Sequence, residues 1–172
     1  MHVPDSGNRS RPLLLVDVDG VISLFGRDVD IGDCVPALVE GIPHVLSRGA
    51  AAALTRLVPH FECVWCTGWE DRAGSHLPHL LDLPGGWRHI AFSDPPEDAA
   101  HWKLRAIDAF AGPDRALAWI DDAHDEHCRA WAAARPGPTV LATTEPATGL
   151  TAEQAAEIER WRRDLAGPPR VI

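Results

Sequence analysis

The sequence has no tyrosine, one methionine and a single lysine, so nearly all of its basic side chains are arginines. It also lacks internal repeats, low-complexity linkers and any apolar run close to the roughly 20 residues that a helix needs to cross a bilayer. Basic residues number 16 against 25 acidic ones, which gives a net charge of −9. Because a surface that binds nucleic acid along its length is basic, we expect no extended nucleic-acid-binding surface, and no membrane contact either.

Residues 1–12 lack the apolar segment of a signal peptide. They are polar and include two prolines, so we expect a flexible N-terminal tail in a cytoplasmic protein. A chain of 172 residues is long enough for one domain with a hydrophobic core. No shift in composition marks a second boundary, and we expect residues 13–172 to form that single domain.

Short apolar segments alternate with segments of helical pattern along the domain. This alternation is typical of a parallel sheet covered by helices on both faces. We therefore expect an α/β fold of the Rossmann-like type, with three layers around a central parallel sheet. The expected strands are 13–17, 62–66, 89–92, 116–121 and 138–142, and the expected helices are 48–58, 69–81, 100–110, 124–134 and 151–165.

Residues 24–47 interrupt this rhythm with several glycines and prolines. Within them, the alternation in VPALVEGIPHVL favours short strands over a helix. We expect an insertion here in the form of a hairpin that projects over the edge of the sheet, with an ordinary long surface loop as the alternative.

Two of the four cysteines, Cys63 and Cys66, form a CxxC motif. Redox CxxC motifs work at a helix N-terminus, where the helix dipole lowers the thiol pKa. This motif instead ends an expected strand, in which residues three apart point to opposite faces. Its spacing to His124, His127 and Cys128 does not close a set of zinc ligands. We interpret the cysteines as buried free thiols.

Two carboxylates, Asp17 and Asp19, follow the buried first strand in the stretch LLLVDVDGVIS. An ionised carboxylate in such a place is costly unless it is paired, hydrogen-bonded or bound to a metal. Side chains at positions i and i+2 leave a strand on the same side, so these two acids can converge on one point.

Other strand ends also carry side chains suited to chemistry. Thr67 and Gly68 follow the second strand, Asp121 and Asp122 follow the fourth, and Lys103 precedes the fourth. In an open α/β sheet, ligands bind beyond the carboxyl ends of the strands, where the strand order reverses. With the strand order 3-2-1-4-5, these residues meet the first strand's acids in one crevice. Each residue taken alone could be explained more simply, as part of a turn, as a helix cap or as a solvated side chain. These explanations account less well for all of the residues in this order at these strand ends.

This ordered set resembles the four motifs of the haloacid dehalogenase-like (HAD) superfamily of phosphohydrolases with an aspartate nucleophile. The motifs read LLLVDVDGV, VWCTG, HWKL and AWIDD here, and they span residues 13–122. The stretches TGWED and WIDDAHD are also similar to HAD domains of bacterial RNA-repair proteins. The resemblance implies an HAD-like Rossmann-like fold with the strand order 3-2-1-4-5.

The resemblance further implies a phosphomonoester hydrolase that depends on Mg²⁺. Asp17 would be the nucleophile that forms an aspartyl-phosphate, and Asp19 would protonate the leaving group and then activate water. Because a halide leaves without a proton, the acid at Asp19 favours phosphate chemistry over dehalogenation. The substrate would contact Thr67, Gly68, Trp69 and Lys103, and the metal ligands would be Asp17, Asp19 (through its carbonyl oxygen), Asp121 and Asp122.

The substrate class is inferred from the lack of room for a cap domain, which many HAD enzymes for small metabolites insert after the first or second motif. Only about 45 residues separate Asp17 from the second expected strand, so no large cap is expected. An open site suits a nucleotide, a nucleic-acid end or a phosphoprotein. Trp69, Trp87 and Trp102 flank the expected mouth and could stack on a base, although core packing is the commoner role of tryptophan.

Two other interpretations remain open. A phospho-accepting receiver domain also places acids, a threonine and a lysine around Mg²⁺, but its acidic pair comes first in the chain, whereas here the pair comes last. A non-catalytic HAD-like binding module is the other alternative, although none of the four motif residues is missing.

Overall fold

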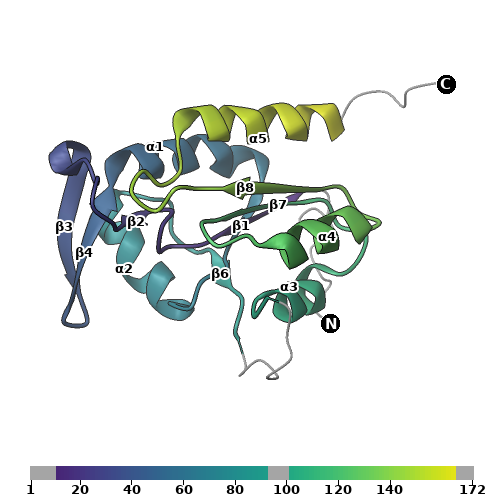
Figure 1. Ribbon diagram of the computed structural model, residues 1–172, viewed down its shortest axis with the longest axis horizontal. Coiled ribbons are helices and arrows are strands. Elements are labelled where there is room, and N and C mark those ends of the chain that lie inside the picture. The colour runs from purple at the N-terminus through teal and green to yellow at the C-terminus, as the bar shows by residue number, and fades with distance from the viewer. Residues whose placement is uncertain (1–10, 93–100, 166–172) are drawn as a thin grey trace, which may run out of the picture.

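The computed structural model of the protein describes residues 11–92 and 101–165. Five parallel strands form its central sheet, in the spatial order β6-β5-β1-β7-β8, with helices on both faces (Figure 1). Numbered by their place in the chain, these strands run 3-2-1-4-5, so the expected strand order is confirmed. The strands are β1 (Leu13–Val16), β5 (Glu62–Trp65), β6 (Arg88–His89), β7 (Leu117–Asp121) and β8 (Thr139–Thr143).

The helices form two layers that cover opposite faces of the sheet. Buried residues of α1, α2 and α5 share one hydrophobic cluster, and buried residues of α3 and α4 share a second. The short 3-10 helix η3 (Val58–His60) directly follows α1. The helices are α1 (Arg48–Leu57), α2 (Asp71–Leu81), α3 (Leu104–Ala111), α4 (Glu126–Ala134) and α5 (Ala152–Leu165). None of them is long and apolar enough to cross a membrane.

Strand β1 lies at the centre of this arrangement and is apolar throughout. Leu14 and Val16 belong to the first cluster, whereas Leu13 and Leu15 belong to the second. Since successive side chains of a strand point to opposite faces, a strand covered on both sides needs an unbroken apolar run. The run ends at Asp17, the first residue beyond the strand.

Several element boundaries differ from those expected. The third strand is shorter, and α3 begins at Leu104, so Lys103 precedes this helix instead of lying within it. Residue 100, where that helix was expected to begin, lies outside the described residues. The start of α5 is as expected, because Thr151 and Gln154 exchange backbone-to-side-chain hydrogen bonds of 3.2 Å in a capping box.

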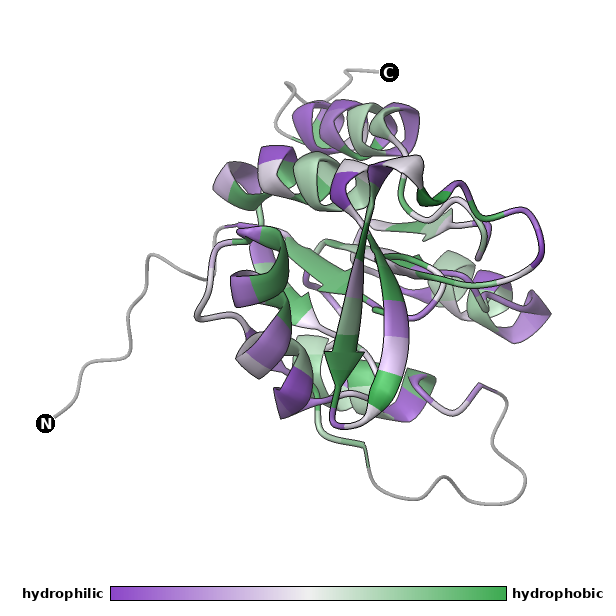
Figure 2. Cartoon of the chain, turned by 90° about the vertical axis from the view of Figure 1, so that its left-hand side faces the viewer, coloured by the Kyte–Doolittle hydropathy of each residue, from purple (hydrophilic) through white to green (hydrophobic). Residues whose placement is uncertain are grey.

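Residues 23–47 form a second, antiparallel sheet with the strand order β2-β4-β3. Its hairpin, β3 with β4, has the register Val39↔Ile42, and the intervening turn has positive φ at Glu40 and Gly41, as a type I′ turn requires. The hairpin stands beyond the carboxyl ends of the central strands and faces the viewer in Figure 2. The expected hairpin is therefore present. The elements are β2 (Ser23–Leu24), the 3-10 helix η2 (Ile31–Asp33), β3 (Cys34–Val39) and β4 (Ile42–Ser47).

The CxxC cysteines lie on opposite faces of the sheet, as expected for a strand. Cys63 belongs to the first hydrophobic cluster and Cys66 to the second, and all four cysteines are free thiols. Burial raises the pKa of Cys63 to about 12 and also raises that of Cys66. These thiols are therefore protonated at neutral pH, which is the opposite of what a redox motif needs.

Candidate functional site

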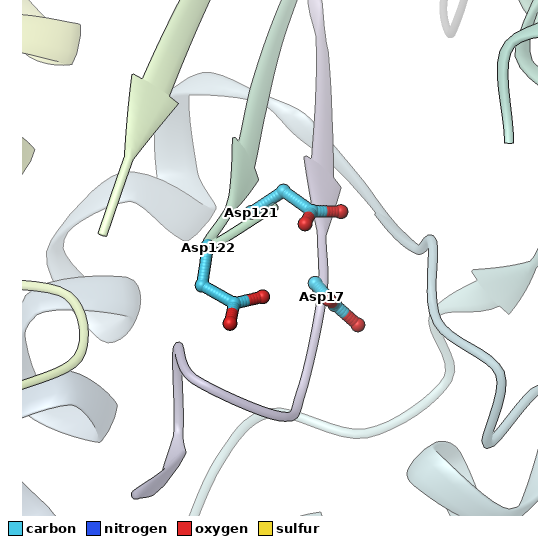
Figure 3. Close-up of side chains that lie close together, drawn as sticks. All are labelled: Asp17, Asp121 and Asp122. Atoms are coloured by element: carbon cyan, nitrogen blue, oxygen red, sulfur yellow. The ribbon is translucent and has the colours of Figure 1, made fainter. Parts of the chain in front are cut away.

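Three carboxylates converge at the carboxyl ends of β1 and β7. The two strands are neighbours in the register Val16↔Ile120, and Asp17 N donates to the carbonyl oxygen of Ile120 at 3.0 Å. Asp17 and Asp121 are therefore side by side, and Asp122 follows (Figure 3). One carboxylate oxygen from each residue lies within 4.8 Å of the others. In the described part of the chain, this is the only group of three or more such side chains close enough to share a metal ion.

Gly20 makes room for Asp122 in this cluster. Its φ of +73° is in the left-handed region, and a Cβ at this position would lie 2.5 Å from Asp122 Cγ. The loop is also tied to β7, because Thr144 Oγ1 donates to the Gly20 carbonyl at 2.7 Å and Thr144 N donates to the Asp121 carbonyl at 3.1 Å. The DxDG motif thus requires glycine at position 20, because a larger residue would collide with Asp122. Thr144 was not identified from the sequence as a residue of the site.

The Lys103 ammonium lies between two of the acids. Its Nζ is 3.0 Å from Asp17 Oδ2 and 2.6 Å from Asp121 Oδ2, and it donates to the Cys66 carbonyl at 2.9 Å. An ammonium has three N–H donors, so all of them have acceptors here. Burial opposes the charge on Lys103, but Asp17 and Asp121 outweigh that effect and raise its pKa.

If all three carboxylates are ionised, they carry more negative charge than the single Lys103 ammonium neutralises. Burial raises the pKa of Asp17 to about 7; Lys103 opposes that shift, and Asp121 adds to it. Burial and then Asp121 also raise the pKa of Asp122. A divalent cation would remove this excess, and a set of carboxylate oxygens suits the hard cations Mg²⁺ and Ca²⁺. The residues present therefore fit a metal ion.

Asp19 lies apart from the three carboxylates. Its side chain is exposed, and its Oδ2 accepts a hydrogen bond of 3.0 Å from Trp69 Nε1. The resemblance to the HAD motifs assigns only the carbonyl oxygen of Asp19 to the metal and implies that its carboxylate transfers a proton.

The loop after β5 brings Thr67 to the same edge of the sheet. Thr67 is buried, and its Oγ1 accepts a hydrogen bond from Trp69 N at 3.2 Å, which leaves the hydroxyl proton available for donation. Glu70 ends this loop with φ +50°, a conformation that costs a residue other than glycine about 1–3 kcal/mol. Glu70 Oε1 holds the loop by accepting from Phe92 N at 3.1 Å.

The three tryptophans expected at the mouth have different surroundings. Trp69 is only 7% exposed, and its ring centroid lies 4.6 Å from that of His44 on the hairpin. Trp102 is 40% exposed, and its ring lies 5.1 Å from Lys103 Nζ. A Cβ added to the neighbouring Gly68 would lie 3.8 Å from the Trp102 ring, so this ring is beside the loop that carries Thr67. Of these two rings, Trp102 is the one that a ligand at the acidic cluster could reach.

Trp87 does not flank the mouth, contrary to expectation. Its ring packs against that of Trp65 with a centroid distance of 4.6 Å. It lines a cavity together with Arg11 and Glu62, which lie at the amino ends of β1 and β5, at the opposite edge of the sheet from Asp17. The physical reason is its place before β6: a residue that precedes a parallel strand lies at the amino edge.

Comparison with protein-family models finds no match for this chain, and comparison with curated proteins finds none either. Any functional conclusion therefore depends on the geometry of the site and on the motifs.

Proposed function

We propose that the protein is an HAD-like phosphomonoester hydrolase that uses Mg²⁺ and an aspartyl-phosphate on Asp17. The observation that carries the proposal is the Lys103 ammonium between Asp17 and Asp121, with Asp122 within metal-sharing distance. This cluster lies at the carboxyl edge of the sheet. The strand order reverses there, between β1 and β7, which is where open α/β sheets bind ligands.

The reaction has two steps. In the first, a carboxylate oxygen of Asp17 forms a bond to phosphorus while the bond from phosphorus to the leaving oxygen breaks, and Asp19 gives that oxygen its proton. In the second, water attacks the phosphorus of the aspartyl-phosphate and gives a proton to Asp19. The bond from phosphorus to Asp17 then breaks and inorganic phosphate is released.

Asp17, Asp121 and Asp122 would hold Mg²⁺ through their carboxylates, and the ion would supply positive charge to the phosphoryl oxygens. Lys103 supplies one positive charge beside Asp17 and Asp121, and together with the ion it would offset the three carboxylates that an anionic phosphoryl group meets. Thr67, through its hydroxyl proton, and the loop amides beside it would hold phosphoryl oxygens.

The rim of the site suits a substrate larger than a sugar phosphate. Between β1 and β5, the described chain contains the three-stranded hairpin sheet, α1 and η3, and no larger insertion. The exposed Trp102 ring offers an aromatic face beside Lys103. A nucleotide or a phosphorylated nucleic-acid end would place a base within reach of that ring.

The strand order argues against the receiver-type alternative. Receiver-like doubly wound folds have the order 2-1-3-4-5, whereas this sheet has the order 3-2-1-4-5. The non-catalytic alternative has no specific observation in its favour, because every side chain needed for the two steps is present at the cluster or its rim.

The test is hydrolysis of p-nitrophenyl phosphate, nucleotides and 5′- or 3′-phosphorylated oligonucleotides with and without Mg²⁺. We expect turnover that requires Mg²⁺ and is lost in Asp17→Asn, which keeps the shape of the side chain but removes the nucleophile. Asp164→Asn, at an exposed position of α5, is the matched control and should retain full activity. Absence of turnover by the unchanged protein on all these substrates, or full activity in Asp17→Asn, would refute the proposal.

A further inference from the structure

We infer that Trp69 is a positioning residue that determines which oxygen of Asp19 carries the proton. The inference builds on the proposed function, in which Asp19 is the acid and base, and adds a residue to that machinery. It starts from one contact, the hydrogen bond of 3.0 Å from Trp69 Nε1 to Asp19 Oδ2.

An indole N–H can only donate a hydrogen bond. The Asp19 oxygen that accepts from it cannot also point a proton of its own toward it. The carbonyl oxygen of a carboxylic acid is a stronger acceptor than its hydroxyl oxygen, so the contact with the indole favours the protonated form in which Oδ2 is the carbonyl oxygen and Oδ1 carries the proton. The same oxygen, Oδ1, then gives its proton to the leaving group in the first step and takes one from water in the second.

Trp69 is itself held in place through both its backbone and its ring. Its own backbone N donates to Thr67 Oγ1 at 3.2 Å, and its ring contacts His44 on β4. His44 is in turn fixed by Ser23, whose Oγ lies 2.9 Å from His44 Nδ1. Ser23, the first residue of β2, is tied to the loop that carries Asp19, because Gly20 N donates to the Ser23 carbonyl at 2.8 Å. The hairpin therefore fixes the indole relative to the acid.

Asp19 needs such a partner because its side chain is exposed. Within residues 11–92 and 101–165, the indole is the only hydrogen-bond donor to its carboxylate. An exposed aspartate without a partner moves among several rotamers, and only some of them point the proton at the leaving oxygen. Loss of the indole N–H should therefore lower the fraction of encounters in which acid catalysis is possible.

The effect should depend on the leaving group. An alkoxide needs a proton as it departs, whereas p-nitrophenolate leaves readily as an anion. The experiment measures kcat/KM for a series of aryl and alkyl monophosphates and plots its logarithm against the pKa of the leaving group. For Trp69→Phe we expect the logarithm of kcat/KM to fall more steeply with rising leaving-group pKa than it does for the unchanged protein. The value of kcat/KM should fall about tenfold on alkyl phosphates and much less on p-nitrophenyl phosphate.

Trp131→Phe is the matched control. It also removes an indole N–H that donates to a carboxylate at 2.9 Å, but that acceptor is Asp108, and both residues lie on helices away from Asp19. We expect its slope to equal that of the unchanged protein. Asp19→Ala sets the upper limit of the effect, since it removes the acid altogether.

The slope separates positioning from simple loss of fold. A variant that is only partly folded loses kcat/KM by the same factor on every substrate, and this uniform loss in Trp69→Phe would overturn the inference. If Trp69→Phe does not fold, His44→Ala decides, because it releases the ring and should steepen the slope in the same direction; an unchanged slope would refute the inference. Asp19→Ala with a steep slope and Trp69→Phe with a normal one would refute the inference alone and leave the proposed function standing.

Discussion

Lys103 and Asp121 form an ion pair that is almost completely removed from solvent. Their Nζ–Oδ2 distance is 2.6 Å, and the two residues are 2% and 0% exposed. Asp17 shares the same ammonium at 3.0 Å. Removing one partner of a buried pair leaves an uncompensated buried charge, which costs about 3–5 kcal/mol. The single lysine of the chain therefore supports the fold as well as the proposed chemistry.

We first predict that Lys103→Met lowers the free energy of unfolding by about 3 kcal/mol or more at neutral pH without metal, because Asp17 and Asp121 lose their counter-charge. Mg²⁺ should restore part of this loss, since the ion supplies positive charge to the same carboxylates. Urea unfolding with and without Mg²⁺ measures both effects. Arg105→Met, on the exposed surface of α3, is the control and should change stability by less than about 0.5 kcal/mol. Equal stability of the two variants would contradict the prediction.

We next predict that Mg²⁺ binds more tightly as pH rises from about 5.5 to about 8. Burial raises the pKa of Asp17 to about 7, so below that pH the ion must displace a proton. The stability of the metal-free protein changes with pH in the opposite direction. Because the pKa of Asp17 is higher in the folded protein than the ordinary aspartate pKa of the unfolded chain, metal-free protein loses stability from this group as pH rises from about 4 to about 7.

Calorimetric titration with Mg²⁺ at several pH values checks the first effect, and urea unfolding of the metal-free protein checks the second. Asp17→Asn should weaken binding and flatten its pH dependence. The raised pKa of Asp122 acts in the same direction, so some dependence should remain in that variant. Binding that is equally tight at all these pH values would show that Asp17 is ionised throughout.

A third prediction concerns Gly20→Ala, which should weaken Mg²⁺ binding strongly. The new Cβ would lie 2.5 Å from Asp122 Cγ, so this carboxylate must move away from Asp17 and Asp121. Gly41→Ala is the control, because Gly41 also has positive φ, +85°, but nothing lies within 4 Å of its added Cβ. Both variants pay a backbone cost of about 1–2 kcal/mol. Only Gly20→Ala should lose metal affinity in the calorimeter, and equal affinity in both would rule out the role given to Asp122.

Finally, Trp102→Ala should reduce the preference for substrates that carry a base. Stacking of a base on an aromatic ring contributes about 1–3 kcal/mol, so kcat/KM for a nucleotide should fall about fivefold or more, while that for a small sugar phosphate changes little. Trp87→Ala, at the opposite edge of the sheet, should leave the ratio of the two values unchanged. A ratio that Trp102→Ala does not alter would exclude stacking on this ring.

The sequence by itself determined the layers of the fold and the edge of the sheet at which the acids gather. An unbroken apolar run such as Leu13–Val16, rich in aliphatic residues and with a glycine shortly after it, favours a strand covered on both faces, and a polar residue directly after such a strand lies at its carboxyl edge. The capping box at Thr151 is equally local, since both hydrogen bonds join residues three apart. Such features depend on neighbours in the chain, which the sequence displays.

Only the tertiary structure decided the contacts between distant loops. Trp69 meets Asp19 because the hairpin places His44 against the indole, and no local pattern encodes that approach. Likewise, Asp122 fits against Gly20 only because β7 pairs with β1 in one register. The alternation of apolar and polar residues along a strand predicts which side chains face the core. Which residues those side chains contact depends on the partner strand and on the register of the pairing. For that reason the sequence could not distinguish the three tryptophans that were expected at the mouth. In the structure Trp102 is exposed, the Trp69 indole donates to Asp19, and Trp87 lies at the opposite edge of the sheet.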